Sequence, residues 1–304
     1  MLNKKILVIL GPTASGKSDL GVRLAKKFKG EIISADSRQV YNDLNIGTGK
    51  ITKKEMGSVP HHLLDVANPK KPFSVAQWLE RTNHAIAEIV RKERIPIVVG
   101  GTGFYIDVLS GRESIANVPV NKKLRARLSK KSNAVLFKSL REKDPRRARS
   151  IDPHNKVRLI RALEIIKALG KVPNVQSPTS DKRFVYIGLK PDNPDERIRT
   201  RLKMRLNGMI AEGKRLHKKG LSYKRMHELG LEYRYVAMYL QRKLNELEMF
   251  NKLNTEIRRY AKRQMTWFKR NKRIKWFTLS AVKGLKLKKF KEIERYVRIA
   301  LMGD

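Results

Sequence analysis

The sequence predicts an α/β fold, in which a P-loop-type parallel sheet is flanked by helices and carries a helical, basic insertion or cap. Three observations support this prediction. Short apolar runs alternate with amphipathic stretches in the first part of the chain, which is typical of a parallel sheet. A glycine-rich phosphate-binding motif directly follows the first apolar run. Between the later runs the chain is polar, with apolar residues three or four positions apart, as in helices.

The expected strands are short apolar runs bounded by polar or glycine residues, which favours buried strands of a sheet. In chain order they are Lys5–Leu10, Glu31–Ala35, Ile95–Val99, Phe184–Leu189 and Lys275–Leu279. The expected helices have apolar residues spaced so that one face of each is apolar. They are Ser18–Phe28, Ser74–Lys92, Pro194–Ile210, Tyr223–Leu229, Tyr233–Leu244 and Leu247–Asn271.

The length of 304 residues suits two structural units, or one large α/β domain with an insertion. We expect a P-loop catalytic core over residues 1–200, with a helical excursion at about 119–150. A helical insertion is expected over residues 201–260, and residues 261–304 are expected to return to the core. No glycine-rich linker and no internal repeat marks these boundaries in the sequence.

The charge of the chain is strongly positive and unevenly distributed. Lys and Arg number 69 and Asp and Glu 28, which gives a net charge of +41. Residues 1–118 carry a net charge of +7, whereas residues 119–304 carry +34. A lysine-rich composition over all solvated faces is one explanation. Arginine-dense stretches such as 146–149 and 258–263 instead favour a surface that binds nucleic acid.

Composition also excludes several classes of protein. The chain has no cysteine, so disulfides, thiolate catalysis and Cys-ligated metal sites are excluded. Its longest apolar runs are of strand length, which excludes a membrane-spanning helix. The first ten residues resemble a strand more than a signal peptide, because they lack a small-residue cleavage site. We therefore expect a soluble, cytoplasmic monomer.

A P-loop motif, G-x-x-x-x-G-K-[ST], follows the first expected strand and begins the first expected helix. In such a loop, successive backbone N–H groups and the helix N-terminus point at a phosphate anion. The lysine neutralises phosphate charge, and the final serine can ligate a Mg²⁺ ion. The motif predicts binding of a di- or triphosphate and does not distinguish ATP from another one. Its residues are Gly11, Pro12, Thr13, Ala14, Ser15, Gly16, Lys17 and Ser18.

A candidate catalytic carboxylate, Asp36, follows the second expected strand. In most P-loop NTPases an acid follows an apolar strand and helps to hold Mg²⁺, but here Ile95–Val99 runs into Gly100–Gly103 without one. The carboxyl ends of parallel strands meet at one edge of the sheet, where ligands bind. Asp36, the P-loop and Thr102 are therefore expected to converge on one crevice.

These motifs, together with others in order along the chain, resemble the tRNA dimethylallyltransferases, the family of IPP transferases. The similar segments span nearly the whole chain, at consistent spacing. They are GPTASGKS at 11–18, DSRQVY at 36–41, IGTGK at 46–50, HHLLD at 61–65, PIVVGGTGFY at 96–105, DP at 144–145, DPHNKVRLIRALE at 152–164 and YAKRQMTWF at 260–268.

The resemblance implies an activity. The family transfers a dimethylallyl group from dimethylallyl diphosphate to N6 of adenosine 37, beside the anticodon of tRNA, and releases diphosphate. It implies that residues 11–18 bind the diphosphate of the prenyl donor, with Mg²⁺ as the cofactor and Ser18 as its ligand. The expected partners are dimethylallyl diphosphate and the anticodon stem-loop of tRNA. The basic helical insertion over 201–260 is then expected to bind this RNA.

The resemblance also implies roles for individual residues. Asp36 matches the catalytic aspartate of the family, and Thr102 and Arg234 match positions of further catalytic contacts. Arg234 is followed by Tyr235, whereas the family pattern is more often Gly-Tyr-Arg-Gln. Two stretches match tRNA-contacting positions. They comprise Asp36, Ser37, Arg38 and Gln39 in the first and Val157, Arg158, Leu159, Ile160 and Arg161 in the second. Arg158 and Arg161 lie three positions apart, so one helix face should carry both.

Two other functions remain open from the residues. A P-loop kinase or ATPase that acts on a small molecule also needs the loop at 11–18, and its basic region would then bind nucleic acid separately. A non-catalytic RNA-binding protein with a vestigial P-loop is the third possibility, and the intact Lys17, Ser18 and Asp36 argue against it.

Overall fold

The computed structural model describes residues 4–173, 181–279 and 287–302. The chain forms two compact units, one from Met1–Ser110 with Asp181–Asp304 and the other from Gly111–Ser180. The expected helical excursion at about 119–150 falls inside the second unit. The expected division of the remainder, with 201–260 as a separate insertion, stays a prediction.

The first unit is built on a six-stranded sheet in the order β3-β2-β4-β1-β5-β6. Every pair of neighbouring strands is parallel, which confirms the predicted fold class. The two-residue edge strand β3 was not predicted, because it is too short to give a pattern. The strands are β1 (Ile6–Leu10), β2 (Gly30–Ser34), β3 (His61–His62), β4 (Ile95–Gly100), β5 (Phe184–Pro191) and β6 (Lys275–Leu279).

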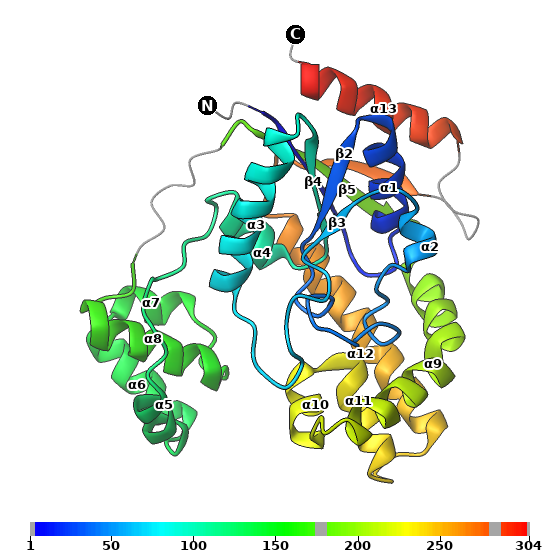
Figure 1. The fold of residues 1–304 in the computed structure, drawn as a ribbon. Helices are drawn as coiled ribbons and strands as arrows, with labels where there is room; N and C mark the ends of the chain where they lie inside the picture. The colour runs from blue at the N-terminus through cyan, green and yellow to red at the C-terminus, as the bar shows by residue number, and fades with distance from the viewer. Residues whose placement is uncertain (1–3, 174–180, 280–286, 303–304) are drawn as a thin grey trace. The chain divides into compact units, whose positions relative to one another are not determined.

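Both faces of the sheet are covered, because its central strands are apolar on both sides. Along β1, Leu7 and Ile9 join one apolar cluster, and Ile6, Val8 and Leu10 join another. The first cluster includes residues of helices α1 (Lys17–Lys27) and α13 (Leu287–Met302). The second includes residues of α3 (Val75–Arg91) and α4 (Gly103–Leu109). Figure 1 shows α3 on one side of the sheet and α1 with α13 on the other.

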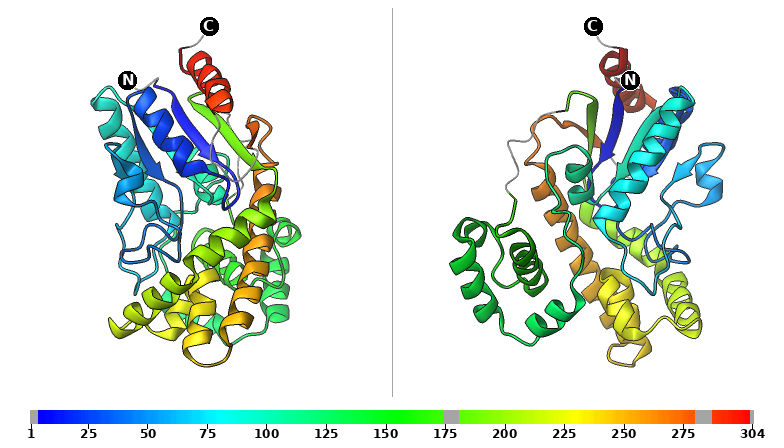
Figure 2. Two further views of the ribbon diagram at one scale, coloured as in Figure 1. Left: turned by 90° about the vertical axis from the view of Figure 1, so that its right-hand side faces the viewer. Right: turned by 60° about the vertical axis from the view of Figure 1, so that its left-hand side comes forward.

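A helical group within the same unit has its own apolar cluster, made mainly by residues of α9 (Pro194–Lys218), α11 (Leu231–Leu240) and α12 (Glu246–Phe268). Ala14 of the P-loop belongs to this cluster, so the helices pack directly against the phosphate-binding loop. Figure 2 shows α9 and α12 lying side by side. The remaining helices of the unit are α2 (Lys53–Met56) and α10 (Tyr223–Leu229).

Over its described residues, 111–173, the second unit consists of helices and the loops that join them. Its core brings together apolar side chains from all its helices, among them Leu124, Leu136, Leu140 and Leu159. Side-chain caps begin these helices, as Asn121, Ser132, Asp144 and Asn155 each accept a hydrogen bond from a backbone N–H. The helices are α5 (Lys122–Ser129), α6 (Asn133–Lys143), α7 (Pro145–Ser150) and α8 (Lys156–Leu169). Within the described part of the whole chain, no helix is long and apolar enough to cross a membrane.

Candidate active site

The P-loop joins β1 to α1 and takes the shape that its glycines permit. Gly11 and Gly16 have φ angles of 152° and 89°, and Ala14 also has a positive φ of 60°. A Cβ on Gly11 would lie 2.4 Å from the carbonyl oxygen of Leu189, so no larger residue fits there. Arg197 of α9 donates from Nε to the carbonyl oxygen of Ala14 at 3.0 Å and holds the loop from outside.

Lys17 is the first residue of α1, directly after the P-loop turn, and it is half-buried. Its ammonium donates to the carbonyl oxygen of Pro12 at 2.7 Å and lies 3.4 Å from the hydroxyl of Ser15. Burial lowers the pKa of Lys17 to about 8; the carboxylate of Asp36 raises it and the guanidinium of Arg201 lowers it further. Asp36 and Arg201 therefore both lie close enough to Lys17 to shift its pKa, and the sequence predicted this proximity for Asp36.

Asp36 follows β2 in a tight turn that its own side chain stabilises. Its Oδ1 accepts hydrogen bonds from the backbone N–H of Arg38 at 2.8 Å and of Gln39 at 3.3 Å. No described residue hydrogen-bonds its other carboxylate oxygen, so Oδ2 is free to accept a proton or a hydrogen bond from a substrate. The Gln39 side chain points to the carbonyl oxygens of Thr48 and Gly49 and connects this turn to the following loop.

Thr102 lies against the Asp36 turn, as predicted. Its hydroxyl accepts a hydrogen bond from the backbone N–H of Ser37 at 3.1 Å, and its own N–H donates to the carbonyl oxygen of Ala35. The two loops are in such close contact that a Cβ on Gly100 would lie 2.1 Å from that same oxygen of Ala35. The P-loop, the 36–39 turn and Thr102 are thus brought together at the carboxyl edge of the sheet.

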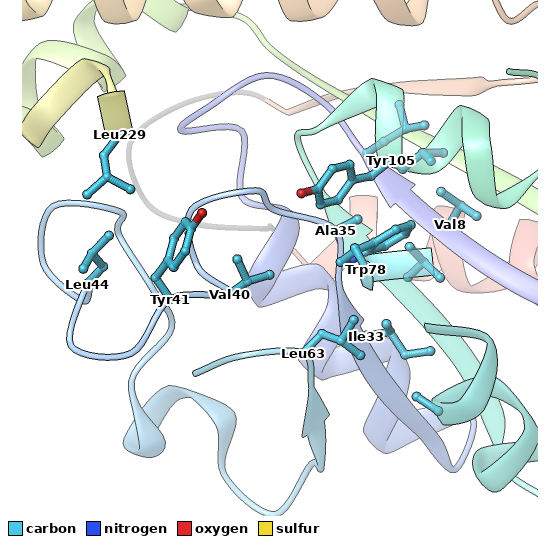
Figure 3. Close-up of a cluster of buried hydrophobic side chains, with 14 of the residues drawn as sticks. Val8, Ile33, Ala35, Val40, Tyr41, Leu44, Leu63, Trp78, Tyr105 and Leu229 are labelled. Carbon is cyan, nitrogen blue, oxygen red and sulfur yellow. The ribbon is translucent and has the colours of Figure 1, made fainter. Parts of the chain in front are cut away.

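The apolar cluster beside this edge contains a stacked aromatic pair. Trp78 and Tyr105 stack with ring centroids 4.6 Å apart, and Figure 3 shows them beside Ala35, the residue before Asp36. The indole N–H of Trp78 donates to the carbonyl oxygen of Ser34 at 2.9 Å and fixes the end of β2. Burial raises the pKa of Tyr105 to about 12, so its hydroxyl stays neutral near Asp36.

A row of arginines on α9 faces the site and was not identified from the sequence. Arg197, Arg201 and Arg205 are spaced at i, i+4 and i+8, which places them on one helix face. Arg205 donates to the carbonyl oxygens of Ile46 and Gly47, whereas no described residue hydrogen-bonds the Arg201 guanidinium. Burial lowers the pKa of Arg201, and the like charges of Arg197 and Arg205 add to this effect. The three like charges on one helix face favour an anion, and their four-residue spacing was the signal in the sequence.

On α11 the structure places Glu232 near the site. Arg234 is exposed, and no hydrogen bond of its side chain is found among the described residues. Burial raises the pKa of Glu232; Arg205 opposes this effect and Asp36 adds to it, so Glu232 lies near both. Tyr233 is buried and donates to Glu212 at 2.7 Å. The catalytic role expected for Arg234 stays a prediction without support from this geometry.

The second predicted tRNA-contacting stretch, 157–161, lies on α8 in the other unit. Val157 is 77% exposed and Arg158 is also exposed, as suits a contact surface. Leu159 is fully buried in the core of that unit. Arg161 donates to Glu164 at 2.5 Å and to the carbonyl oxygens of Ala116 and Val118. The side chains of Leu159 and Arg161 therefore support the fold of the unit, and the tRNA contacts expected for this stretch stay a prediction.

We expect the second unit to lose stability in acid because of Glu164. Burial by itself raises the pKa of Glu164, but hydrogen bonds from Arg125 and Arg161 outweigh it, so the pKa lies at about 2 instead of 4.5. A carboxylate whose pKa is lowered by folding stabilises the fold at pH values above its pKa in the unfolded chain. This contribution disappears as the pH falls from 4.5 to about 2. The contribution is about 2 kcal/mol after solvent screening of the partly exposed arginines.

Urea unfolding of the full chain at several pH values measures this effect. Glu164→Gln should be less stable than the wild type at pH 7, and the difference should disappear between pH 4.5 and about 2. A difference that stays constant over this range would show that the charge of Glu164 does not stabilise the fold.

The carboxyl edge of this parallel sheet holds a P-loop lysine, backbone N–H donors and a carboxylate with one free oxygen. These features define a P-loop enzyme for a phosphorylated substrate. Comparisons with known proteins identify the particular family. The family model described as IPP transferase matches residues 39–271, and that described as isopentenyl transferase matches residues 4–73. The chain is 42% identical over 271 residues to tRNA dimethylallyltransferase 1 of Geotalea uraniireducens, covering 88% of this chain and 89% of the relative.

Solved structures agree with these matches. The tRNA isopentenylpyrophosphate transferase of Bacillus halodurans is 35% identical, with a TM-score of 0.73, and the match covers 99% of this chain and 97% of that one. A eukaryotic dimethylallyltransferase acting on tRNA is 28% identical, with a TM-score of 0.81, and the match covers 98% of this chain and 78% of that one. The chain belongs to the IPP transferase family. The predicted resemblance and enzyme class, a prenyltransferase, are confirmed, and the kinase alternative is not favoured.

Proposed function

We propose that the protein transfers a dimethylallyl group from dimethylallyl diphosphate to N6 of adenosine 37 in tRNA. The products are diphosphate and N6-(dimethylallyl)adenosine. The observation that carries the proposal is the proximity of Lys17 and Asp36 at one edge of the sheet, where the carboxylate of Asp36 raises the pKa of Lys17. Prenyl transfer to an amine needs both groups, a cation for the leaving diphosphate and an acceptor for the proton of the amine.

In this reaction the P-loop binds the diphosphate of the donor. The allylic C–O bond breaks with its electron pair on the diphosphate, so negative charge grows on the leaving group. Lys17 and the N–H groups of the loop stabilise that charge in the transition state. Arg201 faces Lys17 without a hydrogen-bond partner among the described side chains, and it is well placed to bind the same anion.

A Mg²⁺ ion fits the residues of the loop. Such ions keep several waters and bind one or two protein groups together with phosphate oxygens. The hydroxyl of Ser18 is exposed at the start of α1 beside Lys17, so it can supply the protein ligand. When bound, the ion would neutralise charge on the diphosphate. A site made entirely of protein ligands is not needed, and the described residues contain no cluster of three His, Asp or Glu that could form one.

The acceptor adenosine is activated by Asp36. The exocyclic amine of adenine is a poor nucleophile, because its lone pair is delocalised into the ring. The free Oδ2 of Asp36 can accept the N6–H hydrogen bond and take the proton as the new C–N bond forms. The base must leave the stack of the anticodon loop to reach this carboxylate. Ser37, Arg38 and Gln39, and the exposed Arg158 of the other unit, are the proposed contacts to the anticodon stem-loop.

A single assay tests the proposal. The protein is incubated with dimethylallyl diphosphate, Mg²⁺ and an unmodified tRNA that has adenosine at position 37, and the digested RNA is analysed by mass spectrometry. We expect one prenylated adenosine, at position 37. A tRNA with guanosine at that position serves as the control and should stay unmodified. Rapid ATP hydrolysis without any prenylated product would refute the proposal.

Binding of the donor should weaken at alkaline pH because of Lys17. Its pKa of about 8 means that the free protein loses the ammonium charge above this pH. Diphosphate binding then requires uptake of a proton, so the dissociation constant should rise by up to about tenfold per pH unit above pH 8. Calorimetry with Mg²⁺ and inorganic diphosphate measures this dependence. Lys17→Met should bind weakly with little change over the same range, and an equally steep dependence in that variant would assign the titration to another group.

A further inference from the structure

Gln264 on α12 joins two loops of the active site through its side-chain amide. It is 6% exposed. Its Oε1 accepts a hydrogen bond from the backbone N–H of Thr13 at 2.9 Å, and its Nε2 donates to the carbonyl oxygen of Gly101 at 2.8 Å. Thr13 follows β1 and Gly101 follows β4, and these strands are neighbours in the sheet. An uncharged amide has both the donor and the acceptor that this bridge requires.

The surrounding residues leave room for this bridge and for little else. A Cβ on Gly101 would lie 2.4 Å from Nε2 of Gln264, and a Cβ on Gly103 would lie 2.2 Å from the Trp267 ring. The indole N–H of Trp267 donates to Asp107 of α4 at 2.8 Å. The C-terminal half of α12 is therefore fixed directly on the loops, which explains why glycines occupy positions 101 and 103.

The hydrogen bond to Thr13 acts on Lys17 through one peptide group. The carbonyl of Pro12 and the N–H of Thr13 belong to the same planar peptide unit, which rotates as a whole. Lys17 donates to the carbonyl of this unit at 2.7 Å, and Gln264 accepts from its N–H at 2.9 Å. The two side chains hold opposite ends of one peptide plane. If Gln264 is removed, that plane can turn and move the oxygen that orients the Lys17 ammonium.

We infer that Gln264 is a positioning residue for the prenyl donor, because it fixes the Pro12–Thr13 peptide and thereby the ammonium of Lys17. The inference rests on the proposed function for the identity of the donor. The N–H of Thr13 is then already satisfied by the protein and does not bind the diphosphate. Gln264 acts on the affinity of the P-loop and does not touch the reacting atoms.

The test uses Gln264→Met, which keeps the length of the side chain and loses both hydrogen bonds. Gln241→Met is the matched control, because among the described residues the Gln241 side chain donates only to the carbonyl oxygen of Ala237, one turn earlier. Displacement of a catalytic group by about 1 Å can lower the efficiency of an enzyme about 10²-fold. We therefore expect the KM for dimethylallyl diphosphate and the Kd for inorganic diphosphate with Mg²⁺ to rise about 10- to 100-fold. The KM for tRNA should change less than about twofold. The value of kcat should change by a smaller factor than the KM for the donor.

The outcomes separate positioning from general support of the fold. An unchanged Kd for diphosphate would overturn the inference. So would an equal loss of tRNA and diphosphate affinity together with a lower melting temperature, since that describes structural damage. If the wild type binds diphosphate but transfers no prenyl group, the proposed function fails, and the diphosphate Kd still tests Gln264.

A measurement on the wild type does not depend on whether the variant folds. Amide hydrogen exchange at Thr13 should be slow before any ligand is added, because its N–H is bonded to buried Gln264. Fast exchange that becomes slow only with diphosphate would show that the ligand, and not Gln264, holds this N–H group.

Discussion

Asp36→Asn is expected to lower kcat for prenyl transfer about 10²–10⁴-fold. The substitution preserves the shape of the side chain, and the amide oxygen can still accept from the backbone N–H groups of Arg38 and Gln39. The turn should therefore keep its conformation. The amide cannot take a proton from the adenine amine, so only the chemical step should become slower. Single-turnover transfer with saturating tRNA and donor measures that step.

Two control measurements are needed to interpret the expected fall in kcat. The Kd for tRNA should change less than about threefold, since one contact among many is altered. Asp19→Asn is the control carboxylate, because Asp19 is exposed on α1 and pairs only weakly with Arg23 at 3.2 Å. It should retain full activity. If Asp36→Asn transfers the prenyl group as fast as the wild type, Asp36 has no part in the proton transfer.

The second large effect is expected for Lys17→Met, which should lower kcat/KM for the donor about 10²–10³-fold. The lysine charge faces the diphosphate in the bound donor and as the C–O bond breaks, so its loss weakens both donor binding and stabilisation of the transition state. Steady-state kinetics with varied dimethylallyl diphosphate measures the effect. Lys17→Arg should not restore activity, because a planar guanidinium cannot occupy the place of an ammonium that donates to Pro12 and lies near Ser15.

Stability distinguishes this loss from unfolding. Burial lowers the pKa of Lys17 in the free protein, so the charged lysine is unfavourable there without an anion. Lys17→Met should therefore melt at the same temperature as the wild type or higher. A large loss of stability together with the loss of activity would mean that the lysine supports the loop structure rather than the reaction.

Sequence patterns predicted the sheet edge well, because its parts depend on local order along the chain. The P-loop must follow a strand and begin a helix, and Asp36 must follow the next strand. Parallel topology then brings these two together. Thr102 could be placed by the same reasoning. The two-residue strand β3 and the exact ends of the helices could not, because tertiary packing decides them.

The contacts from the helical group could not be predicted, since they depend on side chains far apart in the sequence. Gln264 meets Thr13 across 251 positions, and Glu212 binds the N–H groups of Asn45, Ile46 and Gly47. Helical spacing correctly placed Arg158 and Arg161 on α8. It could not reveal that the side chain of Arg161 would donate a hydrogen bond to Glu164, one turn later.

The position of β1 within the sheet affects how a growing chain acquires its phosphate site during synthesis. β1 is made first, yet its neighbour β5 begins at Phe184, and Gly11 lies against the carbonyl of Leu189. Gln264 and the last strand, ending at Leu279, are made later still. A ribosome that stalls before residue 184 therefore leaves β1 with an unpaired edge, which is a template for aggregation. The P-loop can mature only near the end of translation, so premature termination should yield inactive chains that depend on chaperones.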